Sequence, residues 1–191
     1  MTPSPTALRA LAHPVRLRML GLLRTEGPAT ATGLAQRLDL NSGATSYHLR
    51  QLAEHGFVVD DPGRGNGRER WWRAAHRSTV VPNEAGDETA RDAQNAFLQA
   101  AAVTYNRQIQ QAVEDQSTLD DSWRLASDFS DWSLRLTPDE ARSLVRDLHA
   151  VLDRYRWWRP EDDDGPAGAE HFRLLLQAFP RPGALDPVPG S

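Results

Sequence analysis

The sequence contains no cysteine and no lysine, and it has no long run of apolar residues. Without cysteine, disulfide bonds and thiolate metal sites are excluded, and the chain fits a reducing cytoplasm. No apolar run approaches the roughly 20 residues that a membrane-spanning helix needs, and no signal peptide opens the chain. We therefore expect a cytoplasmic protein that has no membrane partner.

Signs of catalysis are also missing. The sequence has no G-x-S-x-G nucleophile motif and no phosphate-binding glycine loop between a strand and a helix. None of the histidines forms a helical i, i+3 or i, i+4 pair with another or stands in a short cluster with acids, as metal ligands often do. They are His13, His48, His55, His76, His149 and His171. We expect no enzyme activity, no cofactor and no metal site.

The charges divide the chain into two unlike parts. Hydrophobic residues make up 39% of the 191 residues, enough for the core of one large domain or two small ones. Residues 1–77 carry 11 arginines and 6 acids, whereas residues 78–191 carry 11 arginines and 20 acids. A basic part joined to an acidic part is typical of a nucleic-acid-binding domain attached to a different module.

Residues 40–59, LNSGATSYHLRQLAEHGFVV, predict one helix with two unlike faces. Asn41 or Ser42 is a suitable N-cap, and Gly56 suits the left-handed stop. Thr45, Leu49 and Leu52 fall on the inward side at helical spacing. The outward side carries small and polar residues and no acid before Glu54: Ser42, Gly43, Ser46, Tyr47 and Arg50. Such a face suits a helix in a DNA major groove, where base edges present hydrogen-bond donors and acceptors.

The preceding residues predict the other half of a helix-turn-helix. Thr30 is a suitable cap for a short helix that buries Leu34, Ala35 and Leu38. The three-residue turn 39–41 requires a residue that tolerates positive φ, which Asp39 provides. An ordinary helical hairpin is the alternative interpretation, but it does not explain the segment that follows.

That segment predicts a β-hairpin, or wing. Residues 57–59 form an extended run, residues 63–68 form a loop with three glycines and two arginines, and residues 69–74, ERWWRA, return as a strand. A flexible basic tip suits a contact to phosphate or to the minor groove. The alternative is a glycine-rich surface loop with solvated arginines.

Three stretches resemble the ArsR/SmtB family of winged-helix repressors: LRALAHPVRLRMLGLL, TATGLAQRLDLNSGATSYHLRQLAEHGFVV and RGNGRERWWR. The resemblance covers about residues 7–76. It implies a homodimer on a palindromic operator, with Ser42, Gly43, Ser46 and Tyr47 on the base-reading face and Arg50 at a backbone contact. The candidate DNA-contacting residues are Asn41, Ser42, Gly43, Thr45, Ser46, Tyr47, His48, Arg50, Arg64, Arg68 and Arg70.

The chain departs from the family's metal sensors. The segment that corresponds to their cysteine-rich box is TATGLAQRL, which has no ligand, and residues 89–116 contain no histidine. Metal sensing through those sites is therefore not expected. Residues 89–116 predict a long helix that dimerises together with the N-terminal helices, whose apolar surface exceeds one stripe. An intramolecular core helix is the alternative.

The remainder predicts a small strand–helix–strand module. Residues 123–136 and 171–179 read as strands, and Thr137-Pro138-Asp139-Glu140 is a capping box that starts a helix between them. The aromatic residues of this module could line a pocket for a small-molecule effector or form its plain core: Trp123, Phe129, Trp132, Trp157, Trp158, Phe172 and Phe179.

The expected fold is α+β and mainly helical. It comprises a winged helix-turn-helix domain over residues 5–76, a linker and dimerisation helix over 77–116, an α+β module over 117–180 and a loose tail over 181–191. We expect a homodimeric repressor that binds double-stranded DNA through the helix at 42–55 and the wing at 62–70. The alternative function is a winged-helix module that binds protein and not specific DNA.

Overall fold

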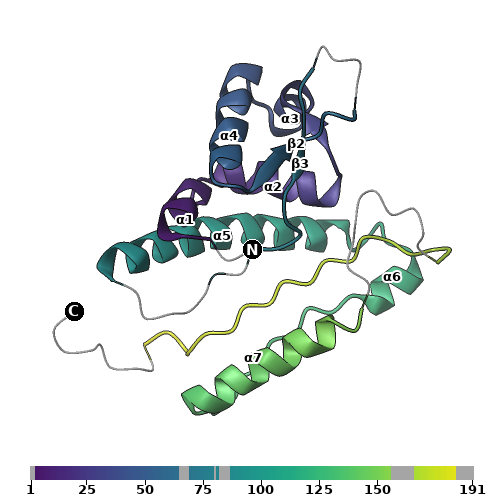
Figure 1. The fold of residues 1–191 in the computed structure, drawn as a ribbon. Coiled ribbons are helices and arrows are strands. Elements are labelled where there is room, and N and C mark those ends of the chain that lie inside the picture. The colour runs from purple at the N-terminus through teal and green to yellow at the C-terminus, as the bar shows by residue number, and fades with distance from the viewer. Residues whose placement is uncertain (1–2, 65–68, 80, 82–86, 156–165, 184–191) are drawn as a thin grey trace. The chain divides into compact units, whose positions relative to one another are not determined.

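The computed structural model describes residues 3–64, 69–79, 81, 87–155 and 166–183 (Figure 1). The chain divides into two units, which are described separately. The first comprises Met1–Arg124 and Trp158–Ala169, and the second comprises Leu125–Trp157 and Glu170–Ser191.

The first unit opens with two short helices whose starts follow from local chemistry. Helix α1 spans Pro5–Leu11, and the Ser4 hydroxyl caps it by accepting from the Ala7 amide. Helix α2 spans Pro14–Thr25, and His13 caps it because its Nδ1 accepts from the Val15 amide at 3.2 Å. Proline at the first helical position completes both starts, since its missing N–H has no partner to lose there.

The helix-turn-helix follows as the sequence predicts. Helix α3 spans Ala31–Leu38 with Thr30 as its N-cap, and helix α4 spans Ser42–Glu54 with Asn41 as its N-cap. Asp39, in the turn between them, has a φ of 55°. Gly56 follows α4 with a φ of 73°, which a side chain would strain.

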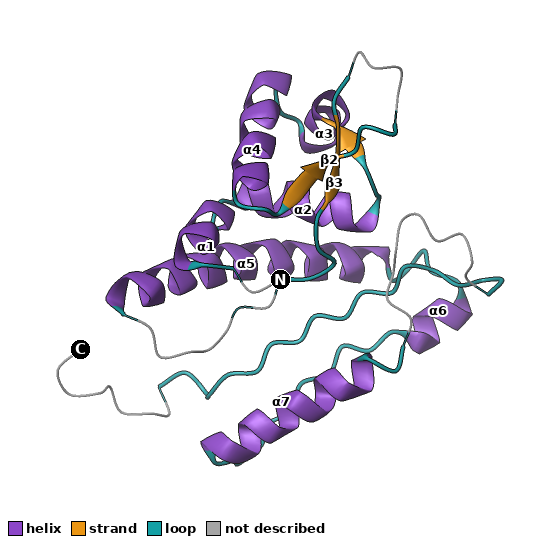
Figure 2. Cartoon of the chain, viewed as in Figure 1, coloured by secondary structure: helices purple, strands orange, loops and turns teal. Residues whose placement is uncertain are grey.

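A small antiparallel sheet forms the wing (Figure 2). Strand β2 spans Val58–Asp60 and strand β3 spans Trp71–Ala74, with Val59 opposite Arg73. The sequence does not predict strand β1, Ala29–Thr30, which pairs with the other edge of β3. The sheet order is therefore β1-β3-β2, and it ties the start of α3 to the wing.

The long helix α5 spans Glu88–Asp115 and completes the core of this unit. Its buried residues are Ala93, Phe97, Ala100 and Ala101, and it packs against α1 and α2. Leu17 and Leu22 of α2 are likewise partly buried against this core, so some of the apolar surface that we expect to meet a second chain is covered within the chain. Among the described helices, none combines the length and apolar character that crossing a membrane requires.

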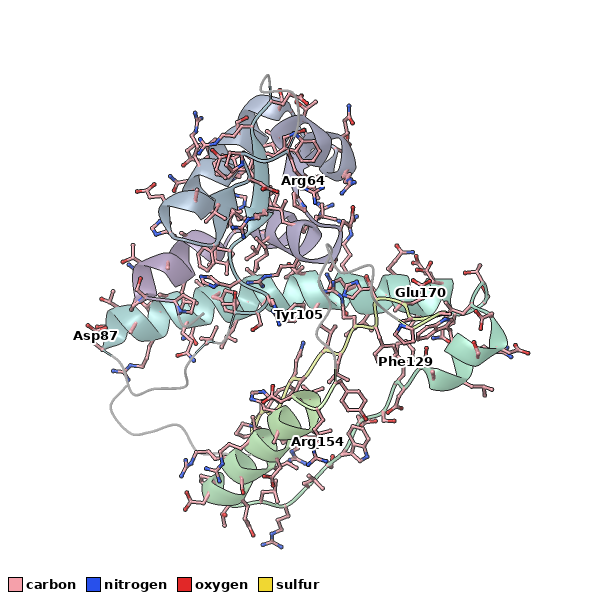
Figure 3. All side chains as sticks on the ribbon, turned by 45° about the vertical axis from the view of Figure 1, so that its right-hand side comes forward. Arg64, Asp87, Tyr105, Phe129, Arg154 and Glu170 are labelled. Atoms are coloured by element: carbon pink, nitrogen blue, oxygen red, sulfur yellow. The ribbon has the colours of Figure 1, made fainter. Side chains whose placement is uncertain are left out.

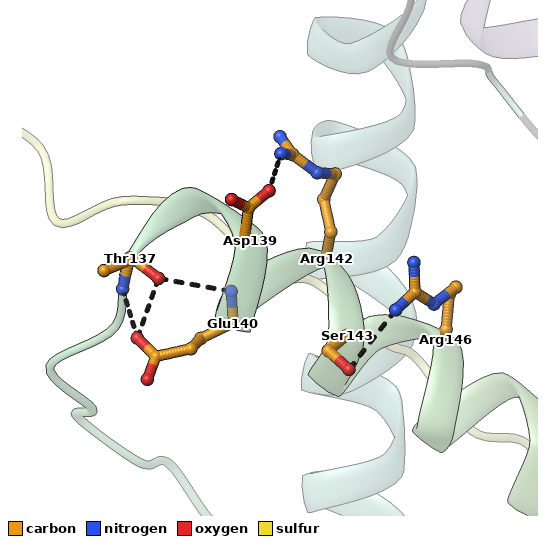
Figure 4. A network of polar contacts seen from close by, with 6 residues as sticks. All are labelled: Thr137, Asp139, Glu140, Arg142, Ser143 and Arg146. Carbon is orange, nitrogen blue, oxygen red and sulfur yellow. Dashed lines mark hydrogen bonds and ion pairs between the residues drawn. The ribbon is translucent and has the colours of Figure 1, made fainter.

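The second unit is built around helix α7, Pro138–Leu152. The predicted capping box is present: the Glu140 amide donates to the Thr137 hydroxyl, and the Thr137 amide donates to the Glu140 carboxylate at 2.8 Å (Figure 4). Arg142, one turn further along α7, forms an ion pair with Asp139 in the first turn.

The two predicted flanking strands are not present in the structure. Trp123 lies in helix α6, Asp121–Ala126, because the Asp120 carboxylate accepts from the amides of Ser122 and Trp123 and starts a helix there. Residues 127–136 and 171–179 are extended, but neither run is assigned as a strand. Alternating apolar residues favour an extended backbone, whereas a strand also needs a hydrogen-bonded neighbour.

Candidate nucleic-acid interface

The outward face of α4 is polar and open. Ser42, Gly43 and Arg50 are exposed, Ser46 is half-buried, and the Tyr47 side chain is 52% exposed. The inward face holds Leu49 and Leu52, which are fully buried in the core. Burial of these leucines fixes the rotation of the helix and so presents the polar face to solvent.

Two of the candidate residues at the start of α4 have structural roles. Asn41 is exposed, and its Oδ1 accepts from the Ala44 amide at 2.7 Å as the helix cap. Thr45 is fully buried, and its hydroxyl donates to the Asn41 carbonyl at 3.0 Å. A side chain without exposed surface cannot contact DNA, so the inclusion of Thr45 among the DNA-contacting residues is wrong. It packs inward with Leu49 and Leu52.

A shallow hollow of about 280 Å³ brings three candidate residues together. Ser46 and Arg50 contribute from α4, and Arg70 contributes from the wing. Its other lining residues are Thr30, Ala31, Thr32, Glu69 and Trp72. The sequence gives no indication that the start of α3 lines this hollow, because strand β1, which ties it to the wing, has only two residues.

The wing arginines are held by neighbouring side chains. Arg70 Nε lies 3.0 Å from Asp60 Oδ2, and the guanidinium carbon stands 4.1 Å from the centre of the Trp72 ring. Arg64 is labelled in Figure 3. Its Nε lies 3.3 Å from Asp61 Oδ2. These exposed pairs orient the two cations at little energetic gain. Arg68 lies outside the described residues.

Arg50 differs from the wing arginines because its charge is not offset. Within the described parts of the chain, its guanidinium forms no ion pair and no hydrogen bond. It is exposed and lines the hollow beside Ser46. An exposed cation at this place is suited to an anion such as a DNA phosphate.

His48, one of the candidate DNA-contacting residues, is half-buried beside two other rings. Its ring lies 4.7 Å from that of His13 and 5.5 Å from that of Tyr47. Burial lowers the pKa of His48, and the nearby His13 and Arg16 lower it further. These effects disfavour the protonated form of His48, and its ring extends from α4 to contact His13 at the start of α2.

Arg24 secures the chain where it leaves the wing. Its Nε donates to the His76 carbonyl at 2.9 Å, and a terminal nitrogen donates to the Thr79 hydroxyl at 2.8 Å. Burial lowers the pKa of Arg24 to about 10, while Tyr105 on α5 opposes this shift. Arg24 thus fixes the exit of β3 to α2, a role that sequence spacing does not indicate.

None of the described C-terminal aromatics is buried, so these side chains do not form the plain core that the sequence allows. Phe129, Trp132, Phe172 and Phe179 are all exposed within the single chain. Trp157 and Trp158 lie outside the described residues. In the described residues, no three His, Asp or Glu side chains come together as metal ligands would.

Comparison with known proteins agrees with this geometry. Residues 11–60 match a family model described as a helix-turn-helix domain. The chain is 43% identical over 56 residues to the HTH-type transcriptional regulator NmtR of Mycobacterium tuberculosis. That match covers 29% of this chain and 46% of NmtR, so the chain spans about half the length of this relative.

Solved structures give weaker similarity. Reduced HlyU from Vibrio cholerae has a TM-score of 0.32 and 22% identity, covering 47% of this chain and 79% of HlyU. A mutant of ZitR from Lactococcus lactis in its apo form has a TM-score of 0.34 and 14% identity, covering 76% and 84%. The assignment therefore rests on the sequence matches. With the helix-turn-helix and the wing, they place the N-terminal part of the chain, about residues 7–76, in the ArsR/SmtB-type family of winged helix-turn-helix regulators.

Proposed function

We propose that the protein is a DNA-binding transcriptional regulator that acts as a homodimeric repressor in the cytoplasm. The observation that carries this proposal is the exposed, acid-free face of α4 between Ser42 and Arg50, which adjoins the hollow shared with the wing. The matched family is one of regulators and not a class of enzymes.

The side chains divide between two kinds of DNA contact. Ser42, Gly43, Ser46 and Tyr47 lie in the first two turns of α4, where a docked helix meets base edges. Each base pair presents its own pattern of hydrogen-bond donors and acceptors in the major groove, so contacts from these residues select the DNA sequence.

The cations lie around this face and attract the backbone. Arg50 is unpaired among the described residues, while Arg64 and Arg70, which are themselves exposed, can exchange their carboxylate partners for phosphate. Contacts of this kind add affinity for any sequence and weaken as salt rises.

A seam along α5 supports dimerisation. Leu98, Ala102, Tyr105, Ile109 and Ala112 follow a 4-3-4-3 spacing, which places them on one stripe of the helix. This stripe lies beside the buried face that contacts α1 and α2. Leu98 and Ile109 remain exposed although the inner face is covered, so the helix has apolar surface left for a second copy.

The test is a gel shift of the full chain with DNA from upstream of its own gene, alongside light scattering. We expect retardation at concentrations that leave a scrambled duplex free, and a mass twice that of the 21.3 kDa chain. Equal affinity for both duplexes at every salt concentration would favour a protein-binding winged helix. A monomer at micromolar concentration would disprove the dimer.

A further inference from the structure

The described residues of the second unit form no buried core. Among residues 125–155 and 170–183, none is buried. Helix α7 carries an apolar stripe through Leu144, Leu148 and Val151, yet Leu148 and Val151 remain exposed. A fold of this length is stabilised mainly by apolar burial, so the module as a single copy has little to hold it together.

Two extended segments present most of its exposed apolar surface. In the first, residues 128–136, Trp132, Leu134 and Leu136 alternate with polar residues and share one side. In the second, residues 174–179, Leu174 and Leu176 share a side, and Phe179 lies at the end. Figure 3 labels Phe129 near the start of the first segment.

The backbone edges of these two segments are also unpaired among the described residues. In the described part of the chain, residues 128–136 and 174–179 make no backbone-to-backbone hydrogen bond across to another strand. An alternating strand with an open edge and an apolar side is a template for strand addition.

We propose that a second copy of this chain completes the module, and that the two copies pair through residues 128–136 and 174–179. The paired segments form a shared sheet whose apolar side buries Trp132, Leu134 and Leu174. Strand pairing satisfies the open edges, and burial of the apolar side supplies the core that one copy lacks.

The available apolar area agrees with such a partner. On the apolar side of the two segments, Trp132 is 75% exposed, and Leu134, Leu136, Leu174 and Leu176 are 62%, 43%, 58% and 41% exposed. With about 200 Å² for the aromatic side chain and less for each leucine, this side offers on the order of 400 Å² per chain. A standard interface buries about 800 Å² per partner, so this surface supplies about half of a standard interface in addition to the α5 contact.

The chain's connectivity favours a second copy over an unrelated partner. Residues 116–124 join the end of α5 to the first residue of the second unit. Such a segment spans at most roughly 35 Å. This step rests on the homodimer proposed above: two copies joined along α5 hold their modules at a high effective concentration.

The first experiment is hydrogen exchange on the full chain, followed by mass spectrometry. We expect amides in residues 128–136 and 174–179 to be protected at least about 100-fold over an unfolded chain. Leu134→Asp should remove this protection from both segments and leave the amides of α4 protected. The matched control, Ser133→Asp, changes the adjacent residue on the other side of the strand and should retain protection. Free exchange in the wild-type dimer would overturn the proposal.

A second experiment decides whether the pairing joins two chains. Because the protein has no cysteine, Leu174→Cys provides one attachment point for a photoreactive crosslinker. In a mixture of ¹⁵N-labelled and unlabelled chains, we expect mixed-isotope crosslinks into residues 128–136 or 174–179. Protection with crosslinks only within one chain would show that the module closes on itself. Light scattering and the gel shift report separately on the α5 dimer and on DNA binding, so those proposals can fail independently.

Discussion

The adjacent residues Thr45 and Ser46 should have opposite effects when each is replaced by alanine. Thr45 is fully buried under α4, whereas Ser46 lines the hollow between α4 and the wing. Thr45→Ala should reduce the free energy of unfolding and leave DNA affinity unchanged. Ser46→Ala should weaken DNA binding and leave the free energy of unfolding nearly unchanged.

The cost of Thr45→Ala follows from three contributions. Removing one buried methyl group costs about 1 kcal/mol. Losing the hydroxyl's hydrogen bond to the Asn41 carbonyl costs roughly 0.5–1.5 kcal/mol. That carbonyl still accepts from the Thr45 amide at 3.1 Å, so it does not lose its last partner. The higher helix propensity of alanine returns up to about 0.5 kcal/mol, which leaves a net loss of about 1–2 kcal/mol.

The assays are urea denaturation and fluorescence anisotropy with upstream DNA, measured well below the melting temperature. Ser46→Ala should change stability by no more than about 0.5 kcal/mol. It should weaken DNA binding about fivefold, which corresponds to about 1 kcal/mol. If Thr45→Ala kept its stability and lost DNA affinity, the assignment of inward and outward faces on α4 would be refuted.

Three further predictions concern pH, salt and metal. Burial lowers the pKa of His13 and His48, so the folded state binds fewer protons than the unfolded state, and stability should fall as pH drops below about 6.5. His13→Asn keeps a hydrogen-bond acceptor for the helix cap but does not titrate, so denaturation at several pH values should show a smaller loss of stability at low pH. An unchanged loss would show that His13 does not contribute to this pH dependence. Arg50→Gln should weaken binding to upstream and scrambled DNA alike and flatten the salt slope by about 0.9, while Arg107→Gln on α5 should not. A loss confined to upstream DNA would instead make Arg50 a base-reading residue. Stoichiometric zinc should leave upstream-DNA affinity unchanged, because the chain lacks cysteine and α5 lacks histidine; a hundredfold drop would contradict this expectation.

Local chemistry made most of the N-terminal fold predictable. Each helix cap, at Thr30 and at Asn41, depends on an amide three positions further along the chain. The left-handed turn depends on Asp39 itself. Such signals are fully present in the sequence. The wing could be predicted for the same reason, since its strands are consecutive and joined by a glycine-rich loop.

Features that depend on distant contacts could not be predicted in this way. Strand β1 has two residues, and its partner, β3, is about forty positions away, so no local pattern identifies it. The network of Arg24 likewise joins α2 to His76 and Thr79.

In the C-terminal module, too, local sequence patterns did not determine the strand pairing. Alternation in residues 128–136 indicates which side is apolar, but it does not say which strand lies beside them. At Trp123, the local cap from Asp120 outweighed the aromatic pattern that suggested a strand.

The central claim is that the outward face of α4 reads DNA sequence, and Tyr47→Ala tests it most directly. Tyr47 is half exposed, so its removal should scarcely affect the fold. Affinity should be measured for upstream and scrambled duplexes at several salt concentrations. We predict a loss of about 5- to 150-fold for the upstream duplex, corresponding to about 1–3 kcal/mol, with binding to the scrambled duplex and the salt slope unchanged. An equal loss for both duplexes would contradict the claim.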